Sequence, residues 1–204
     1  MFKLRKKIDE KIASKVVRYL TNTSITPNQV TTFSLLLAAF AAVFFSFGIY
    51  FFSVIGSILF IFSKFLDNLD GKLARAKNVE SVFGWYYDYF ADTACYILMF
   101  VGISAGISNS SPGAFEINLF NLIHLDLQNY LLFSAIIASL INTILGLFHN
   151  KPTKWPRSDD GDLEDCIYLI GPITWLGFIN FFFLLSTIGS VVFVIYNLKR
   201  NFKK

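Results

Sequence analysis

Charged residues are scarce in this sequence, and cysteine is almost absent. Only 16% of the 204 residues are Asp, Glu, Lys or Arg, whereas 54% are hydrophobic and 18% are aromatic. A typical soluble domain has about 25% charged and 45–50% apolar residues, so this composition excludes an ordinary soluble domain. Intrinsic disorder is excluded too, because it requires low hydrophobicity. The 2 cysteines provide neither a disulfide framework nor the Cys and His spacing of a zinc site.

Basic residues are missing from long apolar stretches, and these stretches predict membrane crossings. All 18 Lys and Arg residues fall in four clusters, within residues 3–18, 64–77, 151–157 and 199–204. A helix needs about 20 apolar residues to cross a hydrocarbon core of about 30 Å. The pattern therefore predicts an all-α integral membrane protein with six transmembrane helices, near residues 29–49, 52–71, 84–106, 128–148, 163–178 and 180–198.

The basic clusters also predict the orientation of the chain. With six spans, both termini and the loops at 72–83 and 149–162 lie on one side of the membrane. Every Lys and Arg then lies on that side or at a helix end next to it. By the positive-inside rule, this side is the cytoplasm.

Residues 1–24 are expected to form an amphipathic juxtamembrane helix that precedes a membrane domain over residues 25–204. Between residues 3 and 20, basic side chains lie opposite apolar ones at helical spacing, the apolar ones being Leu4, Ile8, Ile12, Val16 and Tyr19/Leu20. Such a helix can lie in the cytoplasmic interface among anionic headgroups. Packing against the helix bundle is the alternative. Thr26-Pro27-Asn28-Gln29 then predicts a capping box with proline at the first helical position.

Four aspartates in the second and third predicted spans suggest the chemistry. At about 100° per residue, one face of the second helix carries Asp67, Asp70, Gly71 and Ala74. At four-residue steps, one face of the third helix carries Gly84, Asp88 and Asp92. Two antiparallel helices joined by a short loop can therefore direct four carboxylates into one cleft.

Divalent cations are the natural compensation for this negative charge. Each Asp at a span centre costs about 2.5–3.5 kcal/mol, so four unpaired ones would cost on the order of 10 kcal/mol. Arg75 and Lys72 could neutralise two of them, and solvation at a helix end is the purely structural alternative. Mg²⁺ prefers carboxylates together with substrate phosphates. Two Mg²⁺ or Mn²⁺ ions about 3.5–4 Å apart could hold both sides of a phosphorus centre during in-line displacement.

This pattern resembles the signature of the CDP-alcohol phosphatidyltransferases, DxxDGxxAR followed after eight residues by GxxxDxxxD. The resemblance covers about residues 26–92 and includes Thr26-Pro27-Asn28 before the first span. It implies a six-helix membrane domain over residues 25–204, a homodimer and an active site open to the cytoplasm. Tyr89 is a departure, because many members of the family have a smaller residue there.

The resemblance also implies roles for individual residues. The expected metal ligands are Asp67, Asp70, Asp88 and Asp92. Asp92 is in addition the expected catalytic base. The residues expected to bind the CDP moiety are Gly71, Ala74 and Arg75.

The reaction implied is a step of phospholipid biosynthesis. A metal-dependent transferase would move a phosphatidyl group from a CDP-lipid, such as CDP-diacylglycerol, to the hydroxyl of a small polar alcohol and release CMP. A choline or ethanolamine type phosphotransferase, with a diacylglycerol acceptor, stays open as an alternative. A divalent-cation carrier is a remote one, because a carrier would place polar residues at the bilayer midplane and the acids here gather towards one surface.

The partners expected are therefore the CDP-linked donor, the alcohol acceptor and membrane lipids, with no nucleic acid. A phosphorylated acceptor would need a basic pocket. Lys151, Lys154 and Arg157 lie on the expected side to supply one. The positive-inside rule alone also predicts basic residues at these positions.

Overall fold

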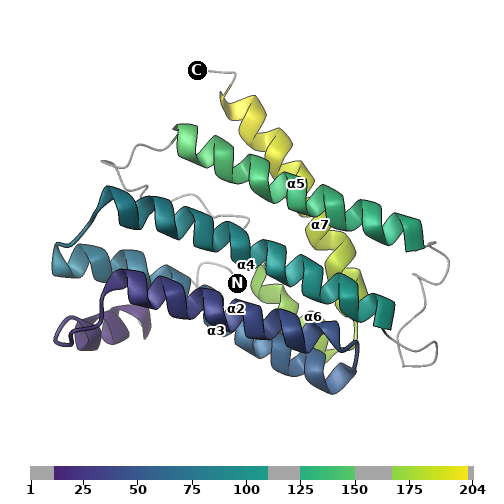
Figure 1. Cartoon of the computed structure of the whole chain (residues 1–204), viewed down its shortest axis with the longest axis horizontal. Coiled ribbons are helices and arrows are strands. Elements are labelled where there is room, and N and C mark those ends of the chain that lie inside the picture. The colour runs from purple at the N-terminus through teal and green to yellow at the C-terminus, as the bar shows by residue number, and fades with distance from the viewer. Residues whose placement is uncertain (1–11, 110–124, 150–166, 202–204) are drawn as a thin grey trace.

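The computed structural model of this chain describes residues 12–109, 125–149 and 167–201, and these are helical almost throughout (Figure 1). A helix over residues 12–20 comes first. The helices that follow are α2 (Pro27–Ser46), α3 (Tyr50–Lys77), α4 (Val82–Asn109), α5 (Leu125–His149), α6 (Ile170–Trp175) and α7 (Ile179–Asn201). The described residues contain no strand, so the all-α prediction is confirmed.

Five of these helices are long and apolar enough to cross a membrane, namely α2, α3, α4, α5 and α7. Within the described part of the chain, the remaining predicted span, near residues 163–178, contains a 3₁₀ turn at 167–169 that leads directly into the 6-residue helix α6. Gly177 has a φ of 82°, which ends that helix just before α7 begins. Residues 163–166 lie outside the described ranges, and the count of six spans stays a prediction.

Helix α6 lies antiparallel to the first half of α3. The Trp175 indole donates a hydrogen bond of 3.1 Å to Ser57 Oγ, and the Tyr50 hydroxyl donates one of 2.6 Å to the Trp175 carbonyl. Gly171, one turn earlier, faces Ile61. The segment that contains α6 therefore advances towards the end of the bundle where α3 begins.

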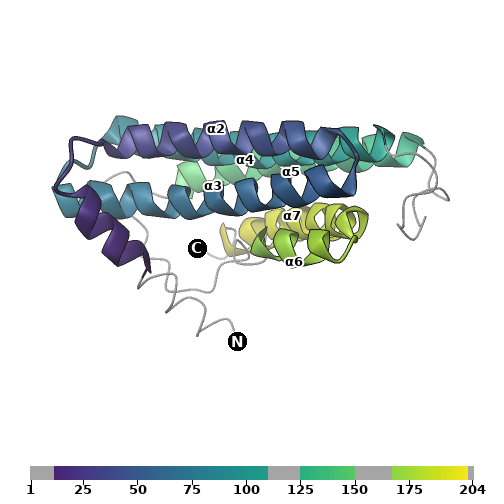
Figure 2. The ribbon, with the colours of Figure 1, turned by 90° about the horizontal axis from the view of Figure 1, so that it is seen from below.

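Helix α2 lies between α3 and α4 and packs along both (Figure 2). Its buried face is rich in small residues, with Val30 and Phe45 beside them, and Ala38 and Ala41 are fully buried. A Cβ atom on Gly56 of α3 would lie 3.0 Å from the Ala41 carbonyl oxygen. One on Gly102 of α4 would lie 2.5 Å from the Ala42 carbonyl oxygen. Small residues let membrane helices approach closely, because little hydrophobic force drives them together within lipid.

Polar contacts set the direction of the last two long helices. Gln128 of α5 donates a hydrogen bond of 3.1 Å to Ser108 Oγ near the end of α4. Thr143, later in α5, bonds the hydroxyl of Thr93. Asn197 of α7 donates a bond of 3.3 Å to Asn142. The end of α7 thus lies beside the end of α5, towards the start of α4.

The start of α2 and the end of α3 meet at that same end of the bundle. The Lys77 ammonium donates hydrogen bonds of 2.7 and 2.8 Å to the carbonyls of Thr23 and Ile25. The capping box is confirmed, because Gln29 N–H donates to Thr26 Oγ1 and Thr26 N–H donates to Gln29 Oε1. That this end faces the cytoplasm stays a prediction.

The helix over residues 12–20 packs against this end of the bundle. Ala13 and Val17 are buried in a cluster with Val30, Leu69 and Leu73. Ile12, expected on the apolar stripe, is 47% exposed. The contacts therefore support the packed alternative for residues 13–17. Residues 1–11 lie outside the described ranges, and a position in the membrane interface stays a prediction.

A bulky residue at Gly102 tests the close packing of α2 on α4. We expect Gly102→Val to lower the free energy of unfolding by about 1–3 kcal/mol, because the new side chain meets the backbone at Ala42. Thermal or denaturant unfolding of the detergent-solubilised protein measures this. Gly189→Val on α7 is the control, because a Cβ there meets nothing within 4 Å. Equal stability of the two variants would contradict the packing role.

Candidate active site

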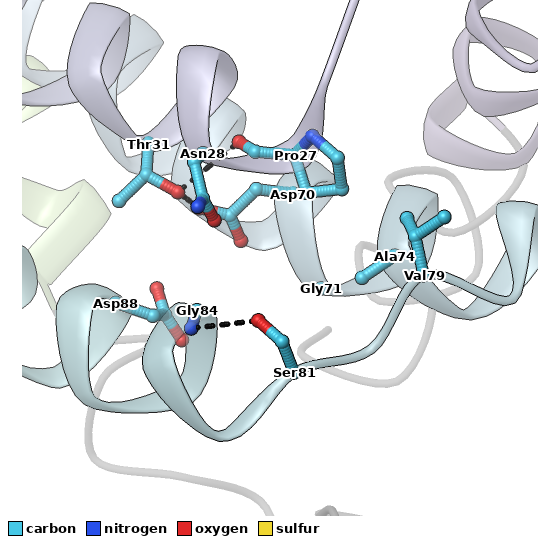
Figure 3. Close-up of a pocket in the computed structure, with 10 residues that line it drawn as sticks. All are labelled: Pro27, Asn28, Thr31, Asp70, Gly71, Ala74, Val79, Ser81, Gly84 and Asp88. Carbon is cyan, nitrogen blue, oxygen red and sulfur yellow. Dashed lines mark hydrogen bonds between the residues drawn. The ribbon is translucent and has the colours of Figure 1, made fainter.

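A tight turn between α3 and α4 brings the two acidic helix faces opposite each other. Asn78 caps α3 in the left-handed conformation, with a φ of 55°. Three residues later, Ser81 Oγ accepts a hydrogen bond of 3.0 Å from the Gly84 N–H, which orders the first turn of α4. In the close-up, Asp70 of α3 and Asp88 of α4 point towards one another from the two helices (Figure 3).

Three of the four predicted carboxylates converge. One ligand oxygen from each of Asp67, Asp70 and Asp88 lies within 4.8 Å of the others. Two oxygens on opposite sides of one Mg²⁺ ion are about 4 Å apart, so a small movement of the side chains would bring these groups into one coordination shell. Among the described residues, these three could hold a divalent ion.

The hydrogen bonding of Asp67 fits such an ion. Its Oδ2 atom accepts a bond of 2.8 Å from the Lys64 ammonium, whereas its buried Oδ1 atom has no hydrogen-bond partner. A buried acceptor without a partner costs free energy. A hard cation at this position would remove that cost, since Mg²⁺ and Mn²⁺ prefer carboxylate oxygen.

Thr31 of α2 is a site residue that the sequence reasoning missed. Its hydroxyl donates to Asp70 Oδ2, which holds that carboxylate from the third helix of the site. Asp70 is only 3% exposed, so this bond is made away from bulk water. The sequence feature that could have indicated this role is the position of Thr31, one helical turn after Pro27 in the helix that begins at the capping box.

Lys64 is the second residue that was missed. Its side chain is only 7% exposed, and its ammonium pairs with both Asp67 of α3 and Asp92 of α4. The same ammonium lies 4.7 Å from the centre of the Tyr96 ring. A basic residue inside an apolar span, three positions before Asp67, is itself a signal of a functional site.

Asp92 is not one of the three acids that group together. Its side chain is 31% exposed and is paired with Lys64, which also pairs with Asp67. Asp67 thus belongs to the group of three and is also linked to Asp92 through Lys64.

An open cleft lies between α2, α3 and α4, and two of the three carboxylates, Asp70 and Asp88, line it. The residues that line it are Pro27, Asn28, Thr31, Asp70, Gly71, Ala74, Val79, Ser81, Gly84 and Asp88. A Cβ atom on Gly84 would lie 3.2 Å from Asn28 Oδ1, so glycine keeps this wall open. The small residues predicted to face a ligand, Gly71 and Ala74, lie in the cleft as expected.

Other predicted residues lie elsewhere. Arg75 is exposed on α3 and is not among the residues lining the cleft. Tyr89 packs against Gly146 of α5 and lies against Trp85 with the two rings tilted and their centres 4.7 Å apart, so its bulk points away from the cleft. Lys151, Lys154 and Arg157 lie outside the described residues.

Comparison with known proteins identifies relatives of this site. The family model for CDP-alcohol phosphatidyltransferase matches residues 24–151, which include all four aspartates. The bifunctional IPC transferase and DIPP synthase of Aquifex aeolicus is 33% identical over 89 residues, and that of Archaeoglobus fulgidus is 36% identical over 90 residues. Each match covers 44% of this chain but only 20% and 17% of those relatives, so the chain spans a small part of their length.

Solved structures share the fold over nearly the whole chain. Phosphatidylinositol phosphate synthase of Mycobacterium tuberculosis in its apo form has a TM-score of 0.64 and 19% identity, covering 91% of this chain and 93% of that one. The structure of that enzyme with manganese and citrate has a TM-score of 0.64 and 20% identity, covering 92% and 87%. The structure with CDP-DAG bound has a TM-score of 0.63 and 21% identity, covering 93% and 92%.

Metal binding at the three carboxylates can be measured without substrate. At an Mn²⁺ concentration of about 100 times the dissociation constant, binding should stabilise the folded protein by about 2.7 kcal/mol and raise its melting temperature. We expect Asp88→Asn to abolish most of this shift. Glu80→Gln is the control, because this exposed acid lies outside the group of three. Equal shifts in both variants would contradict the assignment.

Removing the Thr31 hydroxyl tests its hold on Asp70. We expect Thr31→Val to weaken Mn²⁺ binding by about 10–100-fold, as is typical when a residue that orients a metal ligand is lost. Titration followed by electron paramagnetic resonance measures the free ion directly. Thr31→Ser keeps the hydroxyl and should bind as the wild type does. Unchanged affinity in Thr31→Val would show that Asp70 needs no such support.

Proposed function

Because the chain belongs to the CDP-alcohol phosphatidyltransferase family, we propose that it transfers a substituted phosphoryl group from a CDP-linked donor to a hydroxyl and releases CMP. The observation that carries this proposal is the convergence of Asp67, Asp70 and Asp88 beside a cleft walled by Gly71, Ala74 and Gly84. Acids that can hold a divalent ion, next to small residues that admit a bulky polar ligand, suit a pyrophosphate.

The proposed donor is a CDP-lipid such as CDP-diacylglycerol, and the proposed acceptor is a small polar alcohol. The mycobacterial synthase with the same fold binds CDP-DAG, which supports this choice of donor. Five apolar helices would place the cleft where a lipid-linked substrate can reach it from the bilayer. Lys151, Lys154 and Arg157 are proposed to contact the acceptor if it carries a phosphate.

Each site residue then has a defined task. Asp67, Asp70 and Asp88 would hold Mg²⁺ or Mn²⁺, and the bound ion would offset charge on the pyrophosphate. Gly71 and Ala74 would let the nucleotide approach the backbone of α3, with Arg75 contacting a phosphate.

Asp92 would accept the proton of the attacking hydroxyl. The new bond joins the acceptor oxygen to phosphorus. The bond between phosphorus and the CMP oxygen breaks, and CMP leaves with the electron pair.

We further propose that residues 25–204 form the catalytic membrane domain, that its active site faces the cytoplasm and that the protein is a homodimer. The clustering of all 18 basic residues near one predicted side supports the orientation. Family resemblance supports the homodimer.

A CMP-release assay tests the proposed reaction. Purified protein with Mg²⁺ or Mn²⁺ receives labelled CDP-diacylglycerol or CDP-choline in separate reactions, each with a set of candidate acceptors. We expect CMP from CDP-diacylglycerol, and a decrease of about 10²–10⁴-fold in turnover for Asp92→Asn, with donor binding retained. Glu80→Gln is the control.

Two outcomes would contradict the proposal. CMP formed only from CDP-choline would favour the phosphotransferase alternative with a diacylglycerol acceptor. Full turnover by Asp92→Asn would remove that residue from the role of base.

A further inference from the structure

Lys64 occupies an unusual position for a basic residue. It lies on α3, one turn before Asp67, and its side chain is 7% exposed. Its ammonium is 2.8 Å from Asp67 Oδ2 and also pairs with Asp92 Oδ1 across the gap to α4. The centre of the Tyr96 ring lies 4.7 Å from the same ammonium. Two carboxylates and an aromatic face thus surround one positive charge.

A divalent ion bound between Asp67 Oδ2 and Asp92 Oδ1 would occupy nearly the same place as the Lys64 ammonium. Mg²⁺ binds oxygen at about 2.0–2.1 Å and larger divalent ions bind it at up to about 2.6 Å. An ion at that distance from Asp67 Oδ2 and Asp92 Oδ1 would overlap the Lys64 ammonium, which already contacts both atoms. Repulsion between the two cations adds to this overlap.

The other carboxylate oxygen of Asp67 is available to a different ion. Asp67 Oδ1 is buried without a hydrogen-bond partner, and Asp67 groups with Asp70 and Asp88. One residue therefore faces two cation positions, of which the lysine fills one.

We propose that Lys64 supplies the second cation of this site, so that the substrate-free protein binds one divalent ion, at Asp67, Asp70 and Asp88, and not two. Lys64 is then a positioning residue that holds Asp92 on α4 against α3 before substrate arrives. This inference rests on the proposed function in one respect only, namely that the bound ion is a divalent metal. It replaces the expectation of two metal ions in the substrate-free protein.

Counting bound ions tests this proposal directly. The full chain in detergent, without nucleotide, is titrated with Mn²⁺ and followed by electron paramagnetic resonance. We expect one ion per chain for the wild type and for Lys64→Arg, and two for Lys64→Met, because the vacated position lies between two carboxylates. Lys72→Met is the matched control, since it removes a lysine charge from the same helix away from this pair, and should bind one ion.

A second variant covers the case in which Lys64→Met does not fold. Lys64→Met combined with Asp92→Asn removes the lysine together with one of its two carboxylate partners, and it should bind one ion because the second position has lost a ligand. Two ions bound by the wild type or by this double variant would overturn the proposal. So would a single ion bound by a folded Lys64→Met protein.

The count is independent of turnover, which separates this proposal from the proposed reaction. A protein that binds one ion but releases no CMP from either donor would contradict the reaction and leave the role of Lys64 intact. A protein that releases CMP normally but binds two ions without substrate would contradict only the role of Lys64.

Discussion

Repulsion between carboxylates held close together is the constraint on which the rest of this structure depends. At the 4.8 Å limit within which Asp67, Asp70 and Asp88 group, two negative charges repel by about 3.5 kcal/mol at an effective dielectric constant of about 20. Three such pairs reach about 10 kcal/mol, which is comparable to the whole stability of a typical domain. Rigid support from the helices and cations nearby both help to sustain three ionised carboxylates in this arrangement.

Helix α2 provides the rigid support. It packs along both acid-bearing helices, while α3 and α4 contact each other little. The separation of the two acidic faces thus depends on how closely each helix approaches α2, which is why Gly56 and Gly102 meet its backbone. Thr31 extends from the same helix to Asp70, so one element sets both the spacing of the acids and the orientation of one of them.

Lys64 provides part of the positive charge. It links α3 to α4 through Asp67 and Asp92, at the point where direct contact between these helices is sparse. A buried ion pair of this kind contributes little net stability, because desolvation offsets most of the attraction. Its value here is geometric, since it holds Asp92 of α4 beside Asp67 of α3 while Asp67 Oδ1 keeps no hydrogen-bond partner.

The apolar stretches and the spacing within each helix were enough to predict most of what is local. The long helices α2, α3, α4, α5 and α7 follow from apolar length, and the shared faces of Asp67 with Asp70 and of Gly84 with Asp88 follow from helical periodicity. The predicted span near residues 163–178 stays a prediction, because only its later part, with α6, lies within the described residues.

What only the tertiary structure decided is which side chains meet across helices. The pairing of Lys64 with Asp92, the bond from Thr31 to Asp70 and the exclusion of Arg75 from the lining of the cleft join or separate residues of different elements. Periodicity sets the face on which a residue lies, but not the distance or rotation of the next helix. Those depend on the packing of small residues along α2. Through that packing, three of the four aspartates group together, and Lys64 links one of the three, Asp67, to Asp92.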